Sequence, residues 1–155
     1  MALKIERFQP PGMDIRMQEG KPAYSHVVTV SGTGKLIFIA GQLGRDADGK
    51  IVPGGMRGQM EQTFKNLEKC LTAAGATWAN VIKTNTFVTD YAAFSECRDV
   101  RMRYFGVAVP TSTTIQISGL AQPGAMVEIE MIAAIRLIPT RRAPAPASGG
   151  GLSEG

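Results

Sequence analysis

Side chains that bind metals or form disulfides are scarce in this sequence, which has two cysteines and one histidine in 155 residues. Cys70 and Cys97 fall within helical patterns and have no partner at metal-ligand spacing, so we expect both to pack in a core, in a reducing compartment. His26 has no nucleophile or carboxylate at a recognisable spacing, which favours a strand-face residue over a catalytic base. The acidic turn at 44–49 lacks the later ligands and terminal glutamate of a calcium loop.

Long apolar runs are also missing. No stretch approaches the roughly 20 apolar residues of a membrane span. No N-terminal segment combines a basic start, an apolar run and a small-residue cleavage site. We therefore expect a soluble, cytoplasmic protein with no membrane partner.

Clusters of positive charge and aromatic residues are absent as well. The net charge is +4, but the basic residues are scattered and aromatic residues make up only 6% of the chain. A nucleic-acid-binding face needs clustered Lys and Arg, ideally with aromatics between them. Gly54-Gly55 does not precede a helix with the spacing of a phosphate loop. These absences argue against nucleic acid and nucleotides as partners.

The composition that is present is typical of one globular domain. Hydrophobic residues make up 44% and charged residues 19%, enough for a real core without a disulfide or metal. After residue 138 the sequence changes to Arg, Ala, Pro, Ser and Gly, which cannot bury enough apolar surface to offset the entropy of ordering. We predict a single domain at 1–138 and a flexible tail at 139–155.

Hydrophobic periodicity predicts both strands and helices within that domain. A 3.6-residue period predicts one helix from 59 to 74, ended by Gly75, and a second from 93 to 104. Alternating or β-branched runs predict strands at 24–30, 36–40, 81–88, 110–117 and 126–133. Two helices that each connect strands of a shared sheet favour right-handed crossovers, with both helices packed on one face.

The other face of this sheet has no predicted cover. The run 36–40 is continuously apolar, as expected for a strand that is buried on both faces. The chain offers no further helix to bury the second face. Another copy of the same chain is the economical cover, so we predict a homo-oligomer with strand-lined interfaces.

Two acids stand on the last predicted strand. Because strand side chains alternate between faces, Glu128 and Glu130 share one face while Val127, Ile129 and Met131 share the other. A carboxylate in a cleft must be paired, hydrogen-bonded or protonated, and a raised pKa would suit acid–base work. The competing interpretation is that one or both acids face solvent, as most charged residues do.

Specific residues, in this order, resemble the RidA family, also called the YjgF or reactive-intermediate-deaminase family. The resemblance spans about residues 20–138. The matching pieces are Ala23-Tyr24-Ser25, Phe38-Ile39-Ala40-Gly41-Gln42, Gln62-Thr63, Asn66-Leu67, Ala73-Ala74-Gly75, Val81-Ile82-Lys83-Thr84, Phe87-Val88-Thr89-Asp90, Tyr104-Phe105-Gly106, Val109-Pro110 and Val127-Glu128-Ile129-Glu130.

The resemblance implies a chorismate-mutase-like α+β fold with a mixed six-stranded sheet and two helices on one face. It also implies a homotrimer with a central barrel and with clefts between subunits. In active members these clefts hydrolyse enamines and imines to carbonyl compounds and ammonia, without metal or organic cofactor. Glu128 matches the glutamate thought to handle water or protons. Tyr24, Gly41, Gln42, Ser112 and Thr114 match positions around the substrate.

The sequence departs from the family at several of these positions. The family's arginine, which pairs with the substrate carboxylate, is replaced by Ser112, and a serine offers one neutral hydrogen bond in place of a charge-assisted pair. Ala92 replaces a common asparagine, Ala40 a common serine and Thr114 a common cysteine. We therefore expect an arginine-lacking branch with an altered substrate class.

Three assignments stay open at this point. Arg45 is either a replacement cation or a solvated loop residue. Tyr24 either lines the cleft or packs at an interface. For function, an imine or enamine hydrolase comes first, a non-catalytic trimer that binds a small-molecule metabolite second, and an endoribonuclease third.

Overall fold

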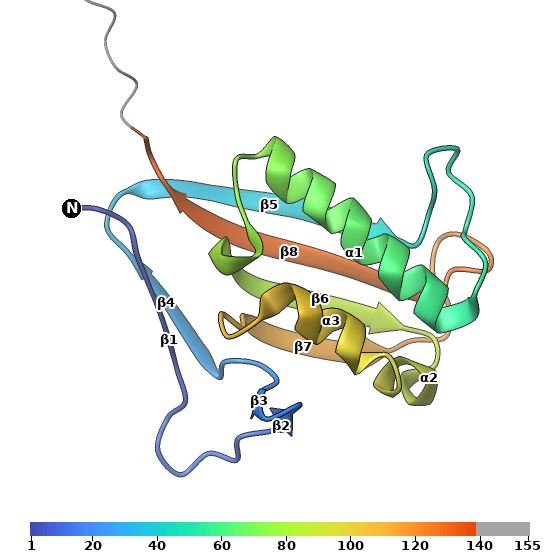
Figure 1. Cartoon of the computed structure of the whole chain (residues 1–155), viewed down its shortest axis with the longest axis horizontal. Helices are drawn as coiled ribbons and strands as arrows, with labels where there is room; N and C mark the ends of the chain where they lie inside the picture. The colour runs from blue at the N-terminus through green and yellow to red at the C-terminus, as the bar shows by residue number, and fades with distance from the viewer. Residues whose placement is uncertain (139–155) are drawn as a thin grey trace, which may run out of the picture.

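The computed structural model describes residues 1–138, so the predicted tail at 139–155 lies outside the described residues. The described chain alternates strands with three α-helices and a short 3-10 helix (Figure 1). In chain order the elements are β1 (Lys4–Phe8), β2 (Met17–Gln18), β3 (Lys21–Pro22), β4 (Val27–Ser31), β5 (Gly34–Leu43), α1 (Gly55–Ala73), η1 (Trp78–Asn80), β6 (Val81–Val88), α2 (Tyr91–Ser95), α3 (Arg98–Phe105), β7 (Thr111–Gln116) and β8 (Val127–Arg136).

A mixed four-stranded sheet forms the centre of the fold, in the order β5-β8-β6-β7. Strand β8 runs antiparallel to β5 and β6, whereas β7 runs parallel to β6 and forms one edge. The remaining described strands form two separate ribbons, β1-β4 and β2-β3. The single six-stranded sheet that the resemblance implied is therefore corrected to four strands plus two ribbons.

The turn after β4 explains this difference. Gly32 adopts φ 84°, a left-handed conformation that favours glycine. A Cβ at this position would lie 2.9 Å from the carbonyl carbon of Ala2, so the turn packs directly on the N-terminal backbone. Strand β4 then pairs along its whole length with β1 instead of continuing the sheet beside β5.

Helix α1 and the pair α2–α3 cover one face of the sheet (Figure 1). The apolar stripe predicted for the first helix is buried against β5 and β8, and Met60, Phe64, Leu67 and Leu71 are each at most 1% exposed. Burying such a stripe stabilises a helix far more than its intrinsic propensity. None of the helices in residues 1–138 is both long and apolar enough to cross a membrane.

The second predicted helix is divided in two. Asp90 caps α2 by accepting a hydrogen bond from the Ala93 N–H at 3.0 Å. The Glu96 carbonyl accepts a hydrogen bond from Arg57 of α1 at 3.0 Å, and Cys97 leaves helical values with φ −106° and ψ 17°. The chain then resumes as α3 at Arg98.

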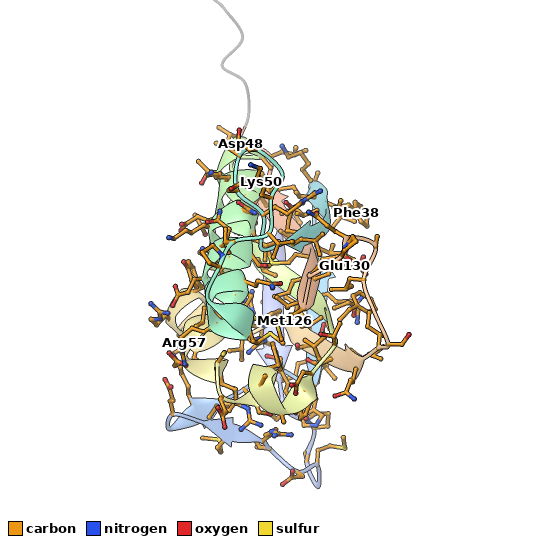
Figure 2. All side chains as sticks on the ribbon, turned by 90° about the vertical axis from the view of Figure 1, so that its right-hand side faces the viewer. Phe38, Asp48, Lys50, Arg57, Met126 and Glu130 are labelled. Atoms are coloured by element: carbon orange, nitrogen blue, oxygen red, sulfur yellow. The ribbon has the colours of Figure 1, made fainter. Side chains whose placement is uncertain are left out.

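The opposite face of the sheet is open within the single chain. Leu36, Phe38 and Ile115 point to this face and are 53%, 72% and 48% exposed. In Figure 2, Phe38 and Glu130 lie on the side of the sheet away from α1, whereas Arg57 lies on the helix side. The sequence-based expectation of an uncovered sheet face is confirmed for the single chain.

Candidate functional site

A cleft of about 300 Å³ lies where the edge strand β7 meets α2, α3 and the segment around β2. Three of the predicted substrate-binding residues, Tyr24, Ser112 and Thr114, line this cleft. Small-molecule sites are usually concave, with a few polar groups that fix the orientation of the ligand.

Hydrogen bonds between distant segments hold these residues in place. The Ser25 hydroxyl, 4% exposed, donates to the Val109 carbonyl at 2.7 Å, and the Ser25 N–H donates to the Pro110 carbonyl at 3.0 Å. This double link fixes Tyr24 beside the start of β7. On β7, the Ser112 hydroxyl is hydrogen-bonded to that of Thr84 at 3.0 Å, so Ser112 is held toward β6.

Positive charge dominates the cleft. Its lining includes Arg16 from the segment before β2 and Arg98 and Arg101 from α3, but no aspartate or glutamate. Arg98 donates to the Ser95 hydroxyl at 3.0 Å. Burial raises the pKa of the Tyr91 phenol, but the hydrogen bond with Arg98 and the charge of Arg16 outweigh it and lower that pKa overall.

Arg101 is the most unusual of these cations because it is buried, with 9% exposed. Its Nη1 donates to the Ala23 carbonyl at 2.5 Å, and its guanidinium lies 4.9 Å from the centre of the Phe105 ring. Its Nη2 is buried and has no hydrogen-bond partner within the described chain. Burial lowers the pKa of Arg101 to about 10.

Sequence reasoning missed Arg98 and Arg101. A signal for Arg101 was present, because it follows Cys97 by four positions and so falls on the inward stripe of that helix. A charged residue on an apolar stripe marks a cation that the fold buries, and burial of an unpaired charge is costly.

Glu128 occupies a different part of the molecule. It is half-buried on β8, between Leu43 of β5 and Phe87 of β6. A Cβ on Gly41 would fall 2.7 Å from Glu128 Cδ, so the carboxylate lies directly on the backbone of this glycine. The β5–β8 ladder contains a bulge between Ile39 and Gln42, and a bulge leaves one residue of its strand unpaired.

Gln42 and Glu130 lie near Glu128. The Gln42 amide donates to the Ala40 carbonyl at 3.1 Å, within the bulge. Glu130 is exposed, and its carboxylate accepts a hydrogen bond from Asn85 at 2.9 Å. The two acids share one face as predicted, but they differ: Glu130 faces solvent, whereas Glu128 is half-buried over a glycine.

The cleft residues and Glu128 project from opposite faces of the sheet. Glu128, Phe87 and Ile115 are paired in one row across three strands, so they share the open face. Ser112 and Thr114 differ from Ile115 by odd numbers of positions and therefore point to the helix side. One chain brings Tyr24, Ser112 and Thr114 together, and separately Gly41, Gln42 and Glu128, but does not join the two groups.

The other candidates lie outside both groups. Arg45 is exposed in its loop and does not line the cleft. His26 Nδ1 is hydrogen-bonded to Gln9 Oε1, and its ring lies 5.2 Å from that of Tyr24. A larger hollow of about 750 Å³ between β1 and the ends of β5 and β8 contains none of the predicted residues. No group of three metal-ligating side chains occurs within residues 1–138.

Similar proteins share both sequence and fold with this chain. A bovine (Bos taurus) protein named 2-iminobutanoate/2-iminopropanoate deaminase is 40% identical over 111 residues, which cover 71% of this chain and 78% of the relative. The human protein of the same name is 34% identical over 111 residues, with 71% and 78% covered.

A crystal structure of a Rid-family protein of unknown function from Yersinia pestis superposes with a TM-score of 0.71 and 28% identity. The match covers 84% of this chain and 98% of that structure. The sequence model of the Endoribonuclease L-PSP family matches residues 18–135. The chain therefore belongs to the Endoribonuclease L-PSP family, which is the RidA/YjgF family of the sequence-based prediction.

Proposed function

We propose that this protein hydrolyses reactive imines and enamines to carbonyl compounds and ammonia. The observation that carries the proposal is the Glu128 carboxylate, half-buried over Gly41 beside a β-bulge, in a family whose relatives at 34% to 40% identity are named imine deaminases. Membership of the family alone would support a shared fold more strongly than a shared reaction. The retained acid supplies the chemical argument.

The reaction needs one group that can both accept and donate a proton. Water adds to the imine carbon while Glu128 accepts the proton that the water loses, and a carbinolamine forms. The protonated Glu128 returns this proton to the nitrogen, which leaves a neutral carbinolamine. Glu128 then accepts the hydroxyl proton of the carbinolamine and passes it to the same nitrogen, the C–N bond breaks, and ammonia leaves as the carbonyl forms. The carboxylate ends in its starting state, so no co-reactant other than water is consumed.

A second copy of the chain would complete the site. Glu128 faces the open side of the sheet, where Leu36, Phe38 and Ile115 are also exposed, whereas the cleft lies beyond the β7 edge on the helix side. If the open face of one subunit covers the β7 edge of another, Glu128 of the first meets the cleft of the second. We therefore include in the proposal a homotrimer that binds a small-molecule metabolite between its subunits.

Because a serine stands at position 112 in place of the family's arginine, other groups must select the substrate. The Ser112 hydroxyl is neutral and already hydrogen-bonded to Thr84. It cannot bind a carboxylate as a bidentate arginine does. We therefore place the choice of substrate in the remaining walls of the cleft.

The test is ammonia release from 2-iminobutanoate generated freshly from its amino acid by an oxidase. The wild-type protein is expected to accelerate release, and Glu128→Gln to lose at least about 100-fold in kcat/KM because its amide cannot accept the proton. Glu130→Gln is the matched control. Glu130 lies two positions further along the same face of β8, but it is exposed and accepts a hydrogen bond from Asn85. Equal loss in both variants, or no acceleration by the wild type, would contradict the proposal.

A trimer that binds the metabolite without turning it over is the second candidate. The absence of a charged donor on β7 favours it, since Ser112 lacks the anchor that orients a substrate in line with water. In this case 2-oxobutanoate would raise the melting temperature. Ammonia release would stay at the uncatalysed rate.

A further inference from the structure

The cation-lined cleft beside β7 holds a charge that the fold itself leaves without a counter-ion. Arg101 is 9% exposed, and none of the described ion pairs includes it. The Ala23 carbonyl and the Phe105 ring face the guanidinium, but the hydrogens of Nη2 have no acceptor. A buried cation with a donor that no group in residues 1–138 accepts from is a favourable place for an anionic ligand.

Arg98 and Arg16 reinforce the charge of Arg101. Arg98 lies one turn earlier on α3, and Arg16 contributes from the segment before β2, so both line the cleft with Arg101. Neither of the acids closest in sequence to Arg101 lines the cleft: Glu96 is exposed, and Asp99 pairs with Arg57 at 2.9 Å. Among the described residues the charge of the cleft is therefore uncompensated.

We propose that Arg101 and Arg98 of α3 bind the carboxylate of the substrate in place of the cation that Ser112 cannot supply. This inference rests on the proposed function and names the substrate class as a 2-imino acid. Ser112 and Thr114, which line the same cleft, face the arginines from β7. A carboxylate between them receives charge-assisted hydrogen bonds from α3 and neutral ones from β7.

The position of the cation also changes the shape of the substrate that fits. An arginine on β7 would extend from the edge strand into the cleft. Arg101 instead belongs to α3, where the Ala23 carbonyl and the Phe105 ring hold its guanidinium in place. The carboxylate is then drawn toward the charged donors of α3, while Ser112 and Thr114 contribute only neutral hydrogen bonds from β7.

The test measures binding of 2-oxobutanoate, the stable product, and of its neutral amide by calorimetry. Arg101→Met removes the charge but keeps an apolar side chain, and we expect its Kd for 2-oxobutanoate to rise about 10- to 100-fold. Arg103→Met is the matched control, since Arg103 lies on the same helix but pairs with Glu61 outside the cleft. It is expected to bind as the wild type does.

Arg98→Gln provides a second variant in case Arg101→Met fails to fold. Because the Arg98 side chain is only half-buried, shortening it leaves no cavity. Its KM for the imine is expected to rise with little change in kcat, a split that a purely structural role would not produce. Wild-type Kd values in both variants, or equal affinity of the wild type for the neutral amide, would overturn the assignment.

The outcomes separate this inference from the proposed reaction. Ammonia release that is unaffected by Arg101→Met and Arg98→Gln would refute the anion site but leave the hydrolase intact. Arginine-dependent binding of 2-oxobutanoate without ammonia release would refute the hydrolase but confirm the anion site. Glu128→Gln is expected to abolish turnover while binding 2-oxobutanoate normally.

Discussion

Gly41→Ala tests the role of Glu128 without altering the carboxylate. The added methyl group would lie 2.7 Å from Glu128 Cδ and 2.8 Å from Cγ. Carbon atoms in contact normally stay about 3.5–4.0 Å apart, so the side chain must move by about 1 Å. Gly41 is not among the residues with a left-handed backbone, so alanine meets no backbone strain there.

The expected effects on stability and activity differ. Forcing the Glu128 side chain off its rotamer costs about 1 kcal/mol, and replacing glycine within a strand recovers about 0.5–1 kcal/mol. The free energy of unfolding should therefore change little. A 1 Å displacement of a catalytic group can lower the rate about 100-fold, which corresponds to about 2.7 kcal/mol in the activation barrier.

The assay compares urea unfolding and ammonia release from 2-iminobutanoate. Gly119→Ala is the control, because no atom lies within 4 Å of its added Cβ. The double variant Gly41→Ala/Glu128→Gln should be no slower than Glu128→Gln alone, since both changes act on one group. A Gly41→Ala protein that is stable and keeps wild-type kcat/KM would refute the placement of Glu128 at the reacting atoms.

Three further predictions concern stability, pH and assembly. Gln59 is 3% exposed; its side chain accepts a hydrogen bond from the Met126 N–H at 2.7 Å and donates one to the Gly124 carbonyl at 2.9 Å. Gln59→Leu should lower the free energy of unfolding by about 2–4 kcal/mol, because two backbone groups lose their partners. An unchanged midpoint in urea titrations would contradict this. Burial lowers the pKa of Arg101 to about 10, so the charged form disfavours folding below about pH 10, and this cost is relieved as the pH rises from 10 toward the ordinary pKa of arginine. The charge-dependent binding of 2-oxobutanoate should persist below pH 10 and fall above it, and flat affinity to pH 11.5 would exclude Arg101 as the anchor. Phe38, 72% exposed in one chain, should be buried between subunits; Phe38→Glu should yield smaller particles by light scattering, and a wild-type monomer would refute the interface.

The sequence predicted the strands near the site because their patterns are local. Strand β6 spans 81–88, as its β-branched residues indicate, and β8 places Glu128 and Glu130 on one face, as a period of two requires. The strand pattern alone does not choose between these acids. The family resemblance singled out Glu128, and its contact with Gly41 of a neighbouring strand is visible only in the structure.

The errors and omissions involve contacts between distant segments. The ribbon β1-β4 forms because Gly32 packs on the N-terminal backbone, and the helix breaks where Arg57 of α1 reaches the Glu96 carbonyl. The burial of Arg101 likewise depends on the Ala23 carbonyl, 78 residues away in sequence. Such contacts leave no periodic signal in the segments that make them.

The central claim is that the reacting site joins Glu128 of one subunit to the arginine-lined cleft of another. Subunits of Glu128→Gln, deficient in proton transfer, and of Arg101→Met, deficient in substrate binding, can be unfolded, mixed and refolded together, and assayed at substrate concentrations well below KM. Random assembly would place both native residues at about one quarter of the sites, so ammonia release should return to about a quarter of the wild-type rate. A mixture no more active than the two variants measured separately would contradict the claim.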